Sequence, residues 1–278
     1  MAKGQRRLAL SVGLLAAFLA LGVPTGPQAA ENEQGAAAEE VRLVPWVDYT
    51  GDLWRRPALT GDWGGTRQTL MDKGLRFDLS FIQTLQGNWA GGTADKSPYQ
   101  MNARYGIQLD TGKAGLWPGG LLVLKGESKY GNSNNGNTGA LLPVNTLSLY
   151  PAPQDDITTL SDLYAVQFLA DWVGVLAGKM TFHDTNVFAS KDDEQFLNAA
   201  FNFDPAVATT IPLNALAAGV ILLPTKWLTI TTMAIDSEGT ATRSGFDTVF
   251  KPGTSLYQMA EFSITPFGLP GHQRIGWT

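Results

Sequence analysis

The sequence predicts an all-β protein whose antiparallel strands form a transmembrane β-barrel, with one short N-terminal helix. After residue 75, about eight segments alternate apolar with polar side chains. Most of them run to roughly 10 residues, close to the length that tilted membrane strands need, whereas strands of soluble sheets average about 5–6. Beyond the N-terminal leader, no segment is apolar for long enough to be a membrane helix. In a membrane the chain would therefore have to form a closed barrel, which satisfies every backbone group in lipid.

Residues 1–30 have the order of parts that is typical of a secretory signal peptide. Three basic residues precede an apolar stretch at 8–23, which Pro and Gly residues then interrupt. Cleavage is expected after Ala30, and the alanine run at 36–38 offers a rival site. The alternative is a membrane helix, because the apolar stretch comes close to the lower limit of about 17 residues.

Composition agrees with export. The chain has no cysteine, and charged residues make up 16%, against about 25% in soluble proteins. Its net charge is −5, and loss of a leader with three positive charges and no acid would make it −8. A chain this acidic is unsuited to a nucleic-acid partner, whose phosphates require basic residues.

The leader is followed by a low-complexity segment and then by the barrel. Residues 31–57 are predicted to form a periplasmic N-terminal arm, loosely ordered at its start, and the alternative is a disordered linker. The barrel domain is expected at 58–278. It opens with a glycine-rich aromatic turn and a short helix over about 66–73, which Gly74 can end because glycine tolerates the left-handed cap.

Strands fill the rest of the chain. In the first, apolar residues at the odd positions from Leu75 to Phe81 alternate with polar residues at the even positions. Pro224 and Pro266 fall at strand ends, where a missing N–H costs least. Tyr and Trp also gather near strand ends, as interfacial girdles require. The expected strands are 75–89, 99–111, 121–130, 160–172, 173–183, 214–223, 225–236 and 255–265, and a ninth begins before the chain stops.

One stretch, 58–92, carries a family resemblance. It joins LTGDWGG, an Arg at 67, Lys73-Gly74 and an alternating strand that runs on to a pair of glycines. This helix-to-strand switch behind GDWGG is an unusual combination, and it resembles the start of the carbohydrate-selective porins, the OprB family. The resemblance covers nearly all of the chain after the leader. It continues through segments at 161–164, 175–179, 186–189, 196–201 and 269–276.

The resemblance implies a barrel of roughly 16 strands, so about half of them are present. The C-terminal part is therefore expected to be missing, and the chain is predicted to be a truncated product or a fragment. It also lacks the C-terminal aromatic typical of such barrels. At 180–181, Met and Thr stand where the family pattern leads us to expect an aliphatic residue and an acid.

Two long connections, 131–159 and 184–213, are rich in turn-forming residues or charges. Loops of this length usually have a function. In a porin they can fold inward and narrow the pore, and 184–203 is the expected inner loop.

Catalytic patterns are not found. The sequence has no Cys nucleophile, no G-x-S-x-G and no H-E-x-x-H. His183 and His272 are far apart and have no Cys or acid cluster at ligand spacing. The acids at 192–194 fit a solvated loop better than a cation site, because contiguous carboxylates cannot all point at one ion. We therefore expect no enzyme, no metal and no cofactor.

A sugar pore needs a constriction whose side chains exchange hydrogen bonds with the solute as it loses water. Arg supplies a planar fork of donors, and carboxylates supply acceptors. Opposite charges two apart, at 76/78 and 125/127, can support each other while contacting a solute. The alternative is that these charges only wet the lumen wall. The lumen-facing candidates for sugar binding are Arg76, Asp78, Arg104, Asp110, Lys125, Glu127, Lys129 and Lys179.

The expected function is diffusion of carbohydrates, glucose-like monosaccharides in particular, through an outer-membrane porin of a Gram-negative bacterium. Its partners would be small-molecule carbohydrates and outer-membrane lipid, with a homo-oligomer as one option. The alternative is a secreted soluble β-sandwich that binds or processes carbohydrate around an apolar centre. Sidedness discriminates the two hypotheses. In a porin, Leu79, Ile107 and Leu124 face lipid, while Asp78, Arg104 and Lys125 face water.

Overall fold

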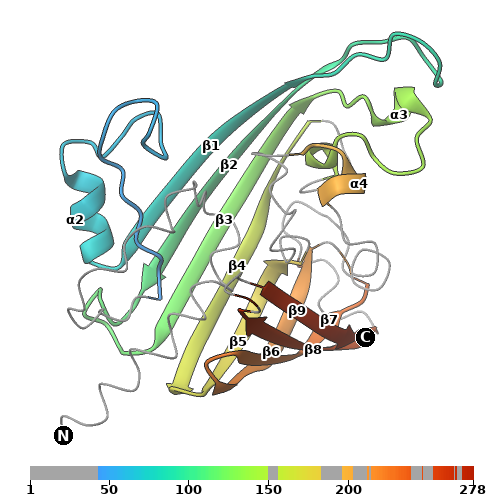
Figure 1. Ribbon diagram of the computed structural model, residues 1–278. Helices are drawn as coiled ribbons and strands as arrows, with labels where there is room; N and C mark the ends of the chain where they lie inside the picture. The colour runs from blue at the N-terminus through green and yellow to red at the C-terminus, as the bar shows by residue number, and fades with distance from the viewer. Residues whose placement is uncertain are drawn as a thin grey trace, which may run out of the picture.

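A single curved sheet dominates the computed structural model. The structure describes residues 43–149, 156–182, 196–202, 212, 214–238, 246, 253–265, 267 and 271–278, so the leader predicted at 1–30 lies outside it. Nine antiparallel strands follow one another in chain order, and β1 and β9 form the two edges of the sheet. Figure 1 shows the sheet curling around a concave side.

The strands are β1 (Leu75–Leu85), β2 (Tyr99–Asp110), β3 (Gly120–Gly131), β4 (Ile157–Ala170), β5 (Val173–Thr181), β6 (Asn214–Thr225), β7 (Leu228–Asp236), β8 (Thr254–Ile264) and β9 (Gly271–Trp277). The described helices are α2 (Thr66–Asp72), α3 (Asn135–Thr138), the 3-10 turn η1 (Thr146–Ser148) and α4 (Ala199–Asn202). None of the helices in the described ranges is long and apolar enough to cross a bilayer.

The predicted all-β, antiparallel fold is confirmed, and each predicted strand is present with shifted ends. The largest shifts at a strand start are at β4, predicted from 160 and found from Ile157, and at β7, predicted from 225 and found from Leu228. There β6 continues through Pro224 to Thr225, and the β6–β7 register shifts between Leu222 and Thr225. Proline has no N–H to donate to the ladder, so an irregularity at this point is expected.

Connections alternate in length along the sheet. The β2–β3, β4–β5, β6–β7 and β8–β9 turns are short, and the intervening connections are longer. In an up-and-down sheet this places all the longer connections at one end, which we call the long-loop end, and α2 with the turns at the short-turn end. Outer-membrane barrels have this asymmetry, with short periplasmic turns and longer extracellular loops.

Side chains alternate between the two faces of β1 to β4 as the sequence predicts. The outer face is apolar: Leu79 is 49% exposed, Ile107 39% and Leu124 44%. The concave face carries the polar set, since Arg76 and Asn102 are almost fully buried. The predicted sidedness is therefore confirmed for these strands, and the dry interior that a soluble sandwich would give to Leu79, Ile107 and Leu124 is not found.

The concave face is not polar throughout, which corrects the simple expectation of a wet inner wall. On β5 to β8 the inward side chains are mostly apolar and pack with one another and with the start of β3 and the end of β4. A contact cluster of this kind excludes water, so the polar part of the wall is confined to a smaller area. The cluster includes Leu121, Val123, Val166, Phe168, Leu176, Ala215, Ala217, Ile221, Leu223, Met233, Ile235, Tyr257 and Met259.

The described part of the predicted arm packs on the sheet. Leu43 and Val44 join the apolar cluster, and the Leu43 N–H donates to Asp110 Oδ2 at 3.1 Å. The Arg67 guanidinium of α2 lies over the ring of Tyr49 at 4.3 Å and over that of Trp63 at 4.2 Å. Cation–π contacts of this length attach the arm to the helix.

The predicted end of α2 is confirmed. Gly74 follows the helix with φ of +79°, a conformation that glycine adopts without strain. A Cβ there would lie 2.6 Å from the Asp110 carbonyl oxygen, so the close approach also requires glycine. Gly74 thus allows the end of the helix to pack closely against the β2–β3 turn.

Candidate functional site

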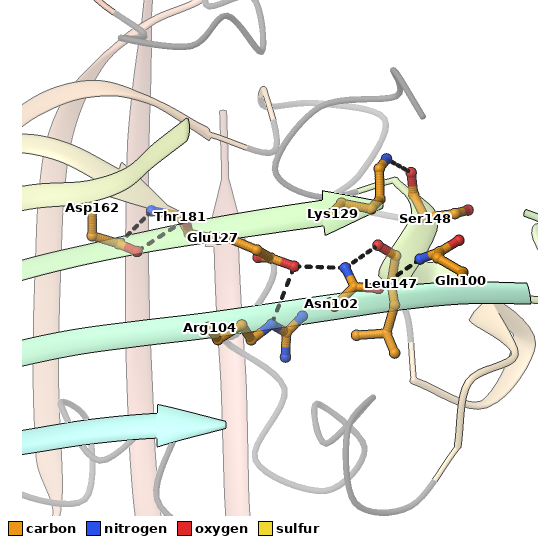
Figure 2. A network of polar contacts seen from close by, with 9 residues as sticks. All are labelled: Gln100, Asn102, Arg104, Glu127, Lys129, Leu147, Ser148, Asp162 and Thr181. Carbon is orange, nitrogen blue, oxygen red and sulfur yellow. Dashed lines mark hydrogen bonds and ion pairs between the residues drawn. The ribbon is translucent and has the colours of Figure 1, made fainter. Parts of the chain in front are cut away.

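A polar network crosses the concave face of β2 and β3. The register places Arg104 directly opposite Glu127, with Nε and Oε1 3.4 Å apart. Glu127 also accepts from the Asn102 amide at 2.9 Å, and Gln100 donates to the Asn102 oxygen at 2.7 Å. Figure 2 shows this chain of contacts from Gln100 to Arg104.

Exposure differs between the two charged members of the network. The Glu127 side chain is 7% exposed, whereas that of Arg104 is 24% exposed. Glu127 is therefore the fixed anchor, and Arg104 is the side that solvent reaches. A carboxylate held by two donors keeps a fixed position on the wall.

The connection between β3 and β4 folds onto this wall. The Asn102 amide donates to the Leu147 carbonyl at 3.0 Å, and the Lys129 ammonium donates to the Ser148 carbonyl at 2.5 Å. Leu147 is 0% exposed. Segment 145–148, which contains η1, therefore lies across the inner side of β2 and β3, and Figure 2 shows its Leu147 and Ser148 bound to Asn102 and Lys129.

A second connection supports the first. The Thr146 N–H and hydroxyl both donate to the Leu197 carbonyl, at 2.8 and 2.9 Å, and the Ala199 N–H donates to the Pro143 carbonyl at 2.9 Å. Of the inner loop predicted at 184–203, only 196–202 lies within the described residues. That part contacts the β3–β4 connection, and α4 stands beside it in Figure 1.

A separate charged pair lies nearer the short-turn end. Arg76 donates from Nε and Nη2 to Asp78 Oδ1 at 3.1 and 3.0 Å, so the predicted mutual support of these residues is present. The Tyr49 hydroxyl of the arm reaches the same oxygen at 3.5 Å. Burial raises the pKa of Tyr49, and the nearby Arg76 opposes this with a smaller effect.

Three sequence candidates stand apart from the network. Asp110 accepts the N–H groups of Gly112 and Lys113 at 3.0 and 3.1 Å, besides that of Leu43, so it organises the β2–β3 turn and holds the arm. Lys125 and Lys179 lie on β3 and β5, where a bulge in β4 interrupts the register.

At this bulge Lys125 is opposite Asp162, which accepts the Thr181 N–H at 3.0 Å. The Lys179 ammonium donates to the Leu160 carbonyl at the same irregularity. Lys179 is only 2% exposed, and its register partner is the outward-facing Leu163. Its amine therefore stabilises the bulge.

The arrangement is built for hydrogen bonding. It offers guanidinium and amide donors beside a carboxylate acceptor, which is the chemistry that recognises hydroxyl groups. Within the part of the chain that the structure describes, no group of three His, Cys, Asp or Glu residues could hold a metal ion.

Comparison with known proteins shows the family. The family model for "Carbohydrate-selective porin, OprB family" matches residues 95–278. The chain belongs to this family. A porin family consists of channels and not of enzymes.

Two solved OprB structures from Pseudomonas putida resemble this porin chain. The high-pH structure has 24% identity and a TM-score of 0.64, over 78% of this chain and 55% of the solved one. The low-pH structure has 18% identity and a TM-score of 0.46, over 78% and 59%. The chain thus spans about half the length of these relatives. No curated protein matches it.

Several polar residues of the concave face were not among the site residues predicted from the sequence. Gln100 and Asn102 share the polar face of β2, but they are uncharged and were passed over. Asp162 shares the inward side of β4 with Val166 and Phe168, but it was not among the candidates from the sequence. Glu127 also pairs with Arg104 on the neighbouring strand, and only the strand register reveals that pairing.

Proposed function

We propose that this chain forms an outer-membrane porin of a Gram-negative bacterium through which carbohydrates diffuse, with glucose-like monosaccharides as the preferred class. The observation that carries the proposal is the Arg104–Glu127 pair on the concave wall, beside the inward segment 145–148. Family membership supports the same function.

The pair suits a neutral, hydroxyl-rich solute. Arg104 offers a planar fork of donors, and the Glu127 carboxylate offers acceptor lone pairs. Asn102 holds Glu127 at 2.9 Å, so the acceptor stays in place when a solute arrives. Each sugar contact exchanges a hydrogen bond with water for one with the wall, so net binding is weak and the solute can leave.

The narrowing of the channel is proposed to come from segment 145–148. On one side, the Leu147 and Ser148 carbonyls accept hydrogen bonds from Asn102 and Lys129. On the other side, the Thr146 hydroxyl donates to the Leu197 carbonyl. A segment tied on two sides gives a constriction of fixed width. In this proposal Arg76, Asp78 and Lys125 line the remaining wall, while Asp110, Lys129 and Lys179 position backbone.

The rest of the chain fits the same scheme. The leader at 1–30 would direct export, residues 31–57 would form the periplasmic arm and 58–278 would form the barrel domain. The exposed apolar residues of the outer face would contact outer-membrane lipid, and a homo-oligomer is one option for assembly.

Liposome swelling with the full chain tests the proposal. We expect influx of glucose, and slower influx of gluconate, which has similar size and one negative charge. Equal influx rates for glucose and gluconate would contradict the proposed preference for neutral sugars. Failure of the chain to enter liposomes, with solubility in buffer free of detergent, would instead support the soluble sandwich.

A further inference from the structure

An asparagine- and glycine-rich run, GNSNNGNTG at 131–139, leads from the end of β3 into the β3–β4 connection. Its composition favours turns, and its middle forms the short helix α3. Figure 1 shows α3 at the long-loop end of the sheet. The constriction proposed above is formed by the later part of the same connection, segment 145–148, and α3 precedes it in the chain.

The side chain of Asn135, in α3, pairs with the main chain of Asn145 in both directions. Its amide donates to the Asn145 carbonyl at 2.9 Å, and its oxygen accepts the Asn145 N–H at 2.8 Å. The same amide donates to the Ser148 hydroxyl. A primary amide is suited to this two-way pairing because it carries a donor and an acceptor side by side. Asn135 thus holds both ends of segment 145–148.

These contacts are sheltered from water. Asn145 is 1% exposed and Ser148 7%. Losing a hydrogen bond at such a place is costly, because solvent does not replace the missing partner. Asn102 and Lys129 bind the Leu147 and Ser148 carbonyls from the strands. The segment is therefore held by the wall from one side and by α3 from another.

The end of α3 is bound by a different connection, the one between β1 and β2. The last carbonyls of a helix have no partner within it. Here the Gly136 carbonyl accepts the Thr93 hydroxyl at 2.6 Å, and the Asn137 carbonyl accepts the N–H groups of Thr93 and Ala94 at 2.9 and 3.2 Å. The Asn88 amide also donates to the Asn137 carbonyl, at 3.1 Å. The β1–β2 connection thus completes the helix.

The two connections meet backbone to backbone at Gly92. Its φ is +71°, and a Cβ there would lie 2.6 Å from the Asn137 carbonyl oxygen. Any larger residue at this position would push the β1–β2 connection away from α3. The approach is therefore as close as the main chains allow, and α3 moves only if both connections move.

We propose that Asn135 is a positioning residue of the channel, which fixes segment 145–148 to α3 and, through α3, to the β1–β2 connection. The inference rests on the proposed constriction at 145–148. The two connections at the long-loop end then act as one unit that keeps the narrow part of the pore at a constant width. The pairing itself uses neutral amides, so it does not depend on the ionisation of Asn135.

Asn135→Asp tests this role. At pH 7 the new carboxylate keeps an acceptor for the Asn145 N–H, but it has no donor for the Asn145 carbonyl. In single-channel recordings of the full chain in a planar bilayer, we expect transitions between conductance levels to be about 3- to 10-fold more frequent than in wild type, as for loss of one hydrogen bond. Acidification through about pH 4 returns a proton that the carboxyl can donate, so the excess over wild type at the same pH should disappear.

Asn132→Asp is the matched control. Asn132 lies in the same connection, and its side chain is exposed. Its N–H donates to the Tyr99 carbonyl at 3.0 Å, and the substitution keeps that main-chain contact. The variant adds the same charge near the same end of the channel, so it should show the wild-type transition frequency at both pH values.

Amide hydrogen exchange gives a second measurement, which needs no open channel. In Asn135→Ala the Asn145 N–H loses its acceptor, so its exchange in the detergent-folded full chain should be about 3- to 10-fold faster at a fixed pH. The Thr111 N–H, which donates to the Gly120 carbonyl at the other end of β2 and β3, should exchange as in wild type. An equal change at Thr111 would indicate general destabilisation and overturn the local role.

The remaining outcomes also decide the matter. A wild-type transition frequency in Asn135→Asp at pH 7, or an excess that persists at pH 4, overturns the positioning role, as does unchanged exchange at Asn145 in Asn135→Ala. Absence of a glucose block of the wild-type current would instead defeat the proposed sugar-porin function. The transitions and the exchange rates would still decide what Asn135 does.

Discussion

The side-chain amide of Asn102 donates to the main-chain carbonyl of Leu147 at 3.0 Å and to the Glu127 carboxylate at 2.9 Å. A single, fully buried side chain therefore joins the inward segment to the charged pair. The width of the constriction and the position of its acceptor depend on the same residue.

Replacing Asn102 with Ala should weaken the attachment of segment 145–148 to the wall. We expect the free energy of unfolding to fall by about 1–3 kcal/mol, because the Leu147 carbonyl and Glu127 lose a buried donor. Single-channel conductance should rise as segment 145–148 moves off the wall. Gln108→Ala is the control, since Gln108 shares the strand and face but is opposite Arg76 and Val123, away from segment 145–148. Equal conductance in both variants would contradict a constriction at 145–148.

Replacing Arg104 with Lys tests the proposed sugar contact at the Arg104–Glu127 pair. The substitution keeps a positive charge but removes the planar fork that holds Glu127 and can donate to a sugar. We expect glucose to block current about 3- to 10-fold more weakly, while cation–anion selectivity stays close to wild type. A glucose block of unchanged strength would mean that Arg104 only supports Glu127.

Placing an arginine on each face of β1 tests sidedness. Leu79→Arg puts a charge on the outer face and should destabilise the folded barrel in lipid by about 2–4 kcal/mol near the bilayer midplane. Ser80→Arg, the adjacent residue on the concave face, should have a much smaller effect. Urea titration of the protein folded in liposomes measures both, and similar losses would argue against lipid on the outer face.

Raising the pH should weaken the attachment of the arm. Burial raises the pKa of Tyr49, so the folded arm keeps a neutral phenol while the unfolded chain ionises near pH 10. Above about pH 10 the unfolded state therefore loses a proton that the folded state retains, and stability falls with rising pH. Tyr49→Phe should give a flatter dependence of the unfolding midpoint between pH 8 and 11. Identical pH profiles would show that Tyr49 does not carry the effect.

Much of the sheet was predictable from local pattern. The period of two in 75–81 predicts the strand and which side chains share a face, and the structure exposes Leu79 by 49% while burying Arg76 to 2%. Gly74 predicts the end of α2 because few other residues adopt its backbone angles. The Arg76/Asp78 pair was also predictable, since both residues are on one strand.

Contacts between strands were harder to predict. Glu127 binds Arg104 and Asn102 because β2 and β3 pair in one register, and a shift of one residue would have turned these side chains to the opposite face. The apolar inner face of β5 to β8 escaped prediction for a related reason. Alternation tells which residues share a face, but not whether that face meets water or another part of the protein.

The sequence by itself determined the strands, their order and the face of each side chain, because these follow from a repeat that is local to each segment. The tertiary structure alone decided which charges meet, where segment 145–148 lies and which part of the inner wall stays polar. Those features depend on register and on chain folding back over long separations, such as Asn102 to Leu147, and neighbouring residues in the sequence carry no record of them.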